Sequence, residues 1–202
     1  MTGDVLTKLL QVCAGERSVD LRDRALLLTA FASGGRRRSE VAALRVEDLV
    51  DEEPVRADPT DAASPPLPCL SIRLGRTKTT TSIDDERVVL IGRPVVAVRG
   101  WLEHAGISEG PVFRRIDQWG SIDRRALTPQ SVNLILKGRC KQPGLEPALF
   151  SAPRLRSGYL TEAANRGMPE AMQQSRHESV AQAASYYNNA YRKNGRAARL
   201  II

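Results

Sequence analysis

The stretch that decides the fold is Leu21–Ser33, LRDRALLLTAFAS, which continues through GGRRR at 34–38 into SEVAAL at 39–44. After Arg24 the first segment is almost entirely apolar and rich in helix-forming residues, so it predicts a central buried helix. Gly34-Gly35 is expected to end that helix. Ser39 then stands at the N-cap position of the next helix, with an acidic residue in its first turn.

Three consecutive arginines, Arg36, Arg37 and Arg38, lie between these two expected helices. A run of three basic residues is ordinarily a solvated loop. A charge cluster just past a Gly-Gly break, between two apolar helices, favours a second interpretation in which one arginine faces a functional cleft. The residues alone leave both interpretations open.

The rest of the chain predicts helices separated by a small sheet. A proline-rich stretch, 52–68, predicts a loop or an insertion at a hairpin tip, and 118–125 predicts a polar connection. His104, near a helix end, is assigned a structural role. The fold class is therefore mainly α with a small antiparallel β-sheet, an α+β fold. We expect further helices at 4–14, 94–105, 128–140 and 151–166, strands at 69–74 and 86–91 paired as a hairpin, and a short strand at 112–114.

Composition is that of one globular domain with a basic surface. The 202 residues are 42% hydrophobic and 26% charged, and 30 Lys and Arg face 23 Asp and Glu. The excess of positive charge favours a polyanionic partner, although a merely basic soluble protein has the same excess. Because only 4% of residues are aromatic, stacking on single strands is less favoured than contact with a duplex backbone.

Cysteine and hydropathy patterns indicate a reducing, aqueous compartment. Cys13, Cys69 and Cys140 are odd in number and widely spaced, so free thiols are the simplest account and a zinc site is disfavoured. No apolar run approaches the ~20 residues that span a bilayer, and the N-terminus lacks a signal-peptide core. We therefore expect a cytoplasmic protein without a membrane partner.

Three residues of the stretch 150–187 suit chemistry on a phosphate diester. Arg156 offers a planar fork of donors, His177 exchanges protons near neutral pH, and Tyr186 is of a type that forms covalent intermediates. No acidic metal-binding cluster accompanies them. The pattern suggests attack on a phosphate by a side chain, with no cofactor and with positive charge in place of a metal ion.

Several blocks, in order, resemble the catalytic domain of the tyrosine recombinases, also called phage-type integrases. They are RDRALLLTAFASGGRRRSEVAALRVEDL, SIRLGRTKTTT, GPVFRRIDQWG, TPQSVNLILKGRC, FSAPRLRSGYLTEAANRGM and QQSRHESVAQAASYY, which together cover about residues 5–190. The resemblance implies a DNA recombination or integration enzyme of a mobile genetic element, working through a 3′-phosphotyrosine intermediate. A nucleoid-associated protein of bacterial, plasmid or phage origin is expected.

The resemblance also assigns residue roles. It makes Arg37, Lys78, Arg156 and His177 catalytic and Tyr186 the nucleophile, with Glu40 orienting Arg37. The neighbouring Tyr187 is the alternative nucleophile, but about 100° of helical rotation per residue would aim it elsewhere.

One position departs from the family pattern. A histidine is expected three residues before the second arginine, and this chain has Pro153 there. Loss of a general base costs about 10²- to 10⁴-fold in rate. Three functions remain open: an active site-specific recombinase, a DNA-binding relative that has lost turnover, and a type IB topoisomerase-like relaxing enzyme.

The expected organisation is a catalytic domain over 1–190 and a basic tail over 191–202 that docks in trans, without the amino-terminal clamp domain usual in the family. Double-stranded DNA is the expected partner, with a tetramer forming on DNA and a monomer without it. Neither the target site nor the choice among integration, excision and resolution follows from the sequence. The expected DNA contacts are Arg36, Arg76, Lys137, Arg139 and Arg154.

Overall fold

The computed structural model describes residues 3–73, 87–141 and 158–161. Five helices and two antiparallel sheets make up most of this part, and residues 158–161 are also helical, which confirms the mainly α, α+β fold class. The helices are α1 (Gly3–Val12), α2 (Ser18–Ala32), α3 (Arg38–Ala43), α4 (Arg93–His104) and α5 (Pro129–Lys141), with a short 3₁₀ turn, η1 (Val46–Asp48). The strands are β1 (Leu49–Arg56), β2 (Pro66–Arg73), β3 (Arg87–Ile91), β4 (Arg114–Ile116) and β5 (Ile122–Ala126).

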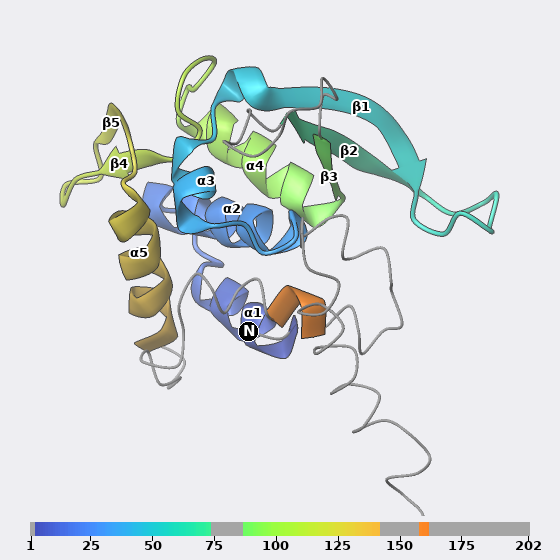
Figure 1. Ribbon diagram of the computed structural model, residues 1–202, viewed down its shortest axis with the longest axis horizontal. Helices are drawn as coiled ribbons and strands as arrows, with labels where there is room; N and C mark the ends of the chain where they lie inside the picture. The colour runs from blue at the N-terminus through green and yellow to red at the C-terminus, as the bar shows by residue number, and fades with distance from the viewer. Residues whose placement is uncertain (1–2, 74–86, 142–157, 162–202) are drawn as a thin grey trace, which may run out of the picture.

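Helix α2 forms the centre of the helical part, as its apolar sequence predicts. It packs against α4 on one side and α1 on the other, while α3 lies across it and contacts α5 (Figure 1). Ala25, Leu26 and Leu27 are fully buried, and Trp101 of α4 lies in the same core, where its indole N–H donates to the carbonyl of Val112 at 2.7 Å. This core holds α2 in place, and the candidate site begins directly after the end of this helix.

The larger sheet has the order β1-β2-β3 and is antiparallel throughout. The predicted hairpin of 69–74 and 86–91 corresponds to β2 and β3, in which Arg73 pairs with Arg87. The expectation of a loop over 52–68 is wrong at both ends, because β1 extends to Arg56 and β2 begins at Pro66. Pro54 obscured β1, since proline lacks an N–H for the ladder. It lies at a register irregularity between Glu52 and Val55, where such a residue is tolerated.

The second sheet is a two-stranded ribbon that differs from expectation. The strand expected at 112–114 begins at Arg114, because Val112 and Phe113 are both buried in the core and do not alternate between two faces. The expected polar connection at 118–125 contains β5, which pairs Ile122 with Ile116 of β4. Both isoleucines pack on the core and so fix the base of the ribbon.

Helix α5 confirms its predicted start but corrects one DNA contact. The hydroxyl of Thr128 accepts a hydrogen bond from the Ser131 N–H at 3.1 Å, as an N-cap does. Arg139, expected on an exposed basic face, is only 8% exposed, and its guanidinium binds Asp20 at 2.9 Å and Asp23 at 2.8 Å. The expectation that Arg139 contacts DNA is therefore wrong, because two carboxylates of α2 draw this turn of α5 inward.

The ionic core cluster comprises Arg22, Arg139, Asp20 and Asp23, all buried between α2 and α5. Asp23 accepts from Arg22 through one oxygen at 2.8 and 2.9 Å, and from the Nε of Arg139 through the other at 2.8 Å. The remaining donors of Arg139 reach the backbone carbonyls of Val12 and Val19. Nearly every polar atom in the cluster therefore has a partner.

The three cysteines are free, as expected, and all three are buried. Burial raises the pKa of Cys13 and of Cys140 to about 11, so both remain protonated thiols. His104 ends α4 and lies 2.9 Å from the Ser18 hydroxyl at the start of α2, which fits its structural assignment. Among the described helices, none has the length and apolar character needed to span a membrane.

Candidate active site

The arginine turn, residues 34–40, begins where α2 stops. The backbone N–H groups of Gly34 and Gly35 both donate to the Phe31 carbonyl, and the Arg36 N–H donates to the Ala30 carbonyl at 2.9 Å. Gly34 and Gly35 have φ values of 84° and 71°, in the left-handed region that disfavours side chains. The double glycine thus both caps α2 and reverses the chain toward α3.

Within the turn, the three arginines have different environments. The Arg36 side chain is 10% exposed and pairs with Glu40 at 3.4 Å, whereas Arg37 and Arg38 are exposed. Arg37 rather than Ser39 is the N-cap of α3. One arginine therefore turns inward, and it is Arg36. This burial does not suit the surface DNA contact expected of Arg36.

Glu40 organises the turn through a single carboxylate oxygen. Its Oε2 receives the ion pair from Arg36 and also accepts from the backbone N–H of Arg37 at 3.2 Å. Glu40 therefore holds the backbone of Arg37, whereas its side-chain ion pair is with Arg36. Sequence reasoning missed the Arg36–Glu40 pair, although their i, i+4 spacing on either side of a helix start was a usable signal.

The guanidinium of Arg37 is left available by this arrangement. Within the described ranges it forms no hydrogen bond or ion pair with another side chain, and Arg37 is the exposed N-cap residue of α3, at the helix end that favours an anion. An exposed arginine without a carboxylate partner is suited to bind an external anion such as a phosphate.

A ring contact joins Tyr159, three positions after the predicted Arg156 in the sequence, to Phe31 near the end of α2. Residues 158–161 are helical; Leu160 is fully buried, and the Tyr159 ring meets Phe31 edge-on with centroids 5.7 Å apart. The contact places Tyr159 against the end of α2, where the arginine turn begins.

The predicted lysine lies in the sequence between β2 and β3. Arg73, the last residue of β2, pairs directly with Arg87, the first residue of β3. Lys78 itself lies outside the described residues, as do Arg76, Pro153, Arg154, Arg156, His177, Tyr186 and the tail 191–202. Lys137, also expected to contact DNA, is half-buried on α5. In the described part of the chain, no three His, Cys, Asp or Glu side chains gather as metal ligands.

Comparison with known proteins agrees with this architecture. The family model described as "Phage integrase family" matches residues 1–193, and the chain belongs to this family. An integrase/recombinase xerD homolog from Selenomonas ruminantium is 31% identical over 172 residues, covering 81% of this chain and 46% of that protein.

Two solved structures of the XerH site-specific recombinase bound to difH substrate share the fold. The post-cleavage complex has a TM-score of 0.69 and 16% identity, covering 99% of this chain and 52% of that one. The pre-cleavage complex has a TM-score of 0.63 and 16% identity, with 98% and 51% coverage. This chain therefore spans about half the length of these relatives.

Proposed function

We propose that residues 1–190 are the catalytic domain of a site-specific DNA recombinase that cleaves and rejoins strands through Tyr186. Membership of the phage integrase family supports this function. The single observation that carries it is the arginine turn, which presents Arg37 without a carboxylate partner in the described structure, beside the anchored Tyr159. Arg37 and Arg156 together would provide the donor set that a phosphodiester in its transition state requires.

The chemistry needs no metal ion and no external energy source. The Tyr186 oxygen attacks the phosphorus as the phenol loses its proton, and the bond from phosphorus to the 5′ oxygen breaks. A 3′-phosphotyrosine bond and a free 5′-hydroxyl result. The 5′-hydroxyl of a second strand then attacks the phosphotyrosine and releases the tyrosine, so the number of phosphodiester bonds is conserved.

The other side chains act on charge and on the leaving group. Arg37 and Arg156 bind the non-bridging oxygens, where negative charge gathers in the transition state. Lys78 protonates the leaving 5′ oxygen, and His177 donates a hydrogen bond to the phosphate. Glu40 supports Arg37 by holding its backbone N–H.

Duplex DNA is the proposed partner, and several copies would assemble on it, a tetramer on two duplexes being the simplest arrangement. Arg76, Arg154 and Lys137 remain proposed phosphate contacts, and the tail 191–202 a segment that docks in trans. Phosphate contacts of this kind fix the register of the protein on the duplex, and side chains in the groove read its sequence.

A nicked duplex provides the direct test. DNA selected by the protein from a random pool is nicked beside the cleavage position, so that the released fragment diffuses away and the covalent adduct accumulates. We expect an adduct visible by denaturing electrophoresis that Tyr186→Phe abolishes and the matched control Tyr187→Phe retains. An adduct that survives Tyr186→Phe would contradict the proposed nucleophile.

Pro153 favours a second candidate, a DNA-binding relative without turnover. Tight duplex binding with no adduct under any condition would support it, whereas relaxation of any supercoiled plasmid would support a topoisomerase-like enzyme instead. If the protein is an active recombinase, Pro153→His should raise the adduct rate by about tenfold or more, because it restores a proton acceptor and donor. An unchanged or lower rate would show that another group already fills this role.

A further inference from the structure

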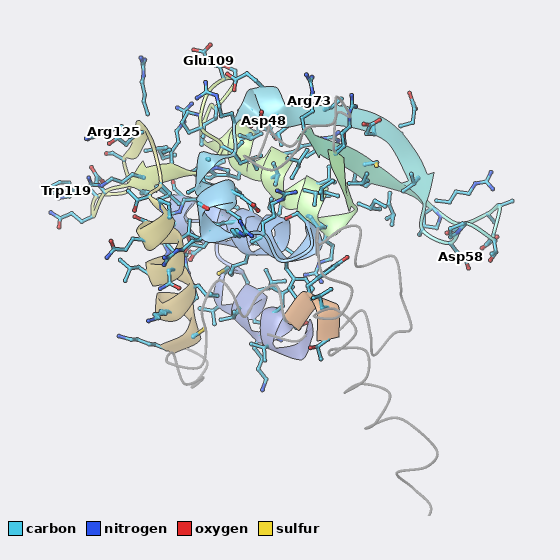
Figure 2. The ribbon with its side chains drawn as sticks, in the orientation of Figure 1. Asp48, Asp58, Arg73, Glu109, Trp119 and Arg125 are labelled. Carbon is cyan, nitrogen blue, oxygen red and sulfur yellow. The ribbon has the colours of Figure 1, made fainter. Side chains whose placement is uncertain are left out.

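Two β-ribbons extend from opposite ends of the long axis of the protein. One is the Trp ribbon, residues 114–126, which comprises β4, β5 and their turn with Trp119. The other is the acidic hairpin, residues 49–73, which comprises β1, β2 and a tip at Asp58. Figure 2 labels Trp119 and Asp58 at the two extremes of the view. Neither ribbon tip contributes a residue to the arginine turn.

The turn of the Trp ribbon holds a large aromatic side chain in solvent. Trp119 is 81% exposed. The Asp117 carboxylate accepts from the N–H groups of Trp119 and Ser121, both at 2.9 Å, and Gly120 adopts a φ of 91°. Because these bonds fix the turn before any partner arrives, binding through Trp119 costs little conformational entropy. Exposed tryptophans of this kind are enriched among the residues that dominate interfaces.

The Trp ribbon is also basic. It carries four arginines and two aspartates. Arg115 and Arg124 are exposed, and neither forms an ion pair with any residue that the structure describes. Trp119 therefore lies on a surface with cationic groups available to an acidic partner.

The acidic hairpin has the complementary chemistry. In a chain with a net charge of +7, it carries five carboxylates and two arginines, and its exposed prolines are Pro54, Pro59, Pro65 and Pro66. Its tip is also held in one shape, because Asp58 accepts from the N–H and the hydroxyl of Thr60 at 2.8 and 2.7 Å. The same two bonds lower the pKa of Asp58, so this carboxylate stays charged.

We propose that the Trp ribbon of one copy of this chain docks on the acidic hairpin of a second copy. The arginines of the ribbon face the carboxylates of the hairpin, and Trp119 packs on proline rings, which are a common partner of aromatic side chains. Since the two ribbons lie at opposite ends of one molecule, they cannot meet within it (Figure 2). The contact is therefore head-to-tail, a heterologous type that forms a ring where the rotation between copies closes and an open filament where it does not.

DNA is the other polyanion that the Trp ribbon can meet, but the observations favour a second copy. Asp117 lies in the turn itself and Asp123 pairs with Arg125 at 2.9 Å, so carboxylates lie beside the arginines. A phosphate backbone is repelled by those carboxylates, whereas a protein surface of mixed charge accommodates them.

This inference rests on the proposed assembly of several copies on DNA, although it does not depend on strand cleavage. Two ribbon tips bury less than the roughly 1,600 Å² of a standard stable interface, so the contact is weak alone. Copies held on one duplex have a high effective concentration, which makes a weak contact sufficient. The test therefore uses Tyr186→Phe protein, in which failure of cleavage has no influence, with and without duplex DNA.

Cysteine cross-linking distinguishes the possible arrangements. One preparation carries Gln118→Cys beside Trp119 and another carries Ala62→Cys in the acidic hairpin; both positions are exposed, and the three natural cysteines are buried. We expect a short bismaleimide to link the two preparations when they are mixed on DNA, and neither preparation alone. Links within the Gln118→Cys preparation alone would indicate a symmetric contact and overturn the proposal, as would the absence of links in the mixture.

Charge-reversal variants then test whether the contact depends on opposite charges of the two ribbons. Arg124→Glu on the ribbon copy should lower the yield of the mixed cross-link about two- to fivefold, and Asp61→Arg on the hairpin copy should restore it. Trp119→Ala should lower the yield about tenfold or more. The control Glu103→Arg changes an exposed charge on α4 and should leave the yield unchanged. If Trp119→Ala instead weakens duplex binding and leaves cross-linking intact, the ribbon contacts DNA and the proposal fails.

Discussion

The ionic core cluster and the arginine turn use the same residue type for opposite purposes. In the cluster, Arg22 and Arg139 are buried, and Asp20 and Asp23 bind their guanidinium groups. In the turn, three arginines lie close in sequence to one carboxylate, that of Glu40, and its ion pair is with Arg36. The balance of carboxylates therefore separates an arginine that stabilises the fold from one that is available to a phosphate.

This difference has an energetic basis. A buried guanidinium without a partner costs several kcal/mol, so an arginine in the core must be fully paired. An exposed guanidinium is solvated and can remain unpaired at little cost until an anion replaces its water. Arg37 and Arg139 both lie close to helix ends. Of the two, only Arg37 is exposed, so only its guanidinium can remain unpaired until an anion binds.

The largest effect should follow removal of Asp23. Asp23→Ala leaves Arg22 and Arg139 buried without their shared partner, and we expect a loss of about 3–5 kcal/mol in unfolding free energy. Urea denaturation followed by circular dichroism measures it. The control Asp123→Ala removes the partner of the exposed Arg125 and should cost less than about 1 kcal/mol. Equal losses in the two variants would refute the contrast between buried and exposed pairs.

The next largest effect should be catalytic rather than structural. Arg37→Ala should lower the rate of adduct formation on the nicked duplex about 10²- to 10³-fold at saturating DNA, the cost of removing one transition-state donor. Its stability should stay within about 0.5 kcal/mol of the parent, because the side chain is exposed. Arg38→Ala is the matched control, with both values near those of the parent. A large fall in stability for Arg37→Ala would mean that this arginine belongs to the fold.

The contrast also explains which elements the sequence could predict. Helices α2, α4 and α5 lie within a few residues of their expected positions, because apolar content, caps and glycine stops are local signals. Strands β1 and β5 were missed because pairing with a distant or bulged partner decides them, and short polar segments carry little signal of that pairing.

Arg139 shows the same limit for a single side chain. It lies two residues from Lys141, which is exposed, and the two looked alike on a basic helix. Its burial depends on Asp23, which lies 116 positions earlier. For the site, the resemblance assigned Arg37 and Glu40. Spacing could not show that the Glu40 carboxylate binds the Arg37 backbone together with the Arg36 side chain, because that requires the turn formed by Gly34 and Gly35.

Glu40 pairs with the Arg36 side chain and also holds the Arg37 backbone, so its variants should have intermediate effects on stability and on adduct formation. Glu40→Gln keeps an acceptor for the Arg37 N–H but loses the charge that pairs with the largely buried Arg36 guanidinium, so we expect a stability loss of about 1–3 kcal/mol. Glu40→Ala also loses the hydrogen bond, which adds about 1 kcal/mol. Adduct formation should fall further for Ala than for Gln, because only Ala releases the backbone of Arg37. Equal rates in the two variants would show that the hydrogen bond does not position Arg37.

The smallest effect that we expect is a pH dependence from Asp20. Burial raises the pKa of this carboxyl, but hydrogen bonds from Arg17 and Arg139 outweigh burial and hold the pKa below its ordinary value of 3.8. A lowered pKa in the folded state contributes stability that is present above pH 3.8 and is lost as pH falls through the folded value. Asp20→Asn should therefore flatten the decline in unfolding free energy below about pH 4, whereas Glu103→Gln, an exposed control, should not. Parallel acid profiles for Asp20→Asn and the parent would show that the arginines do not stabilise the ionised form of Asp20, and that the ionic core cluster contributes to stability through Asp23 instead.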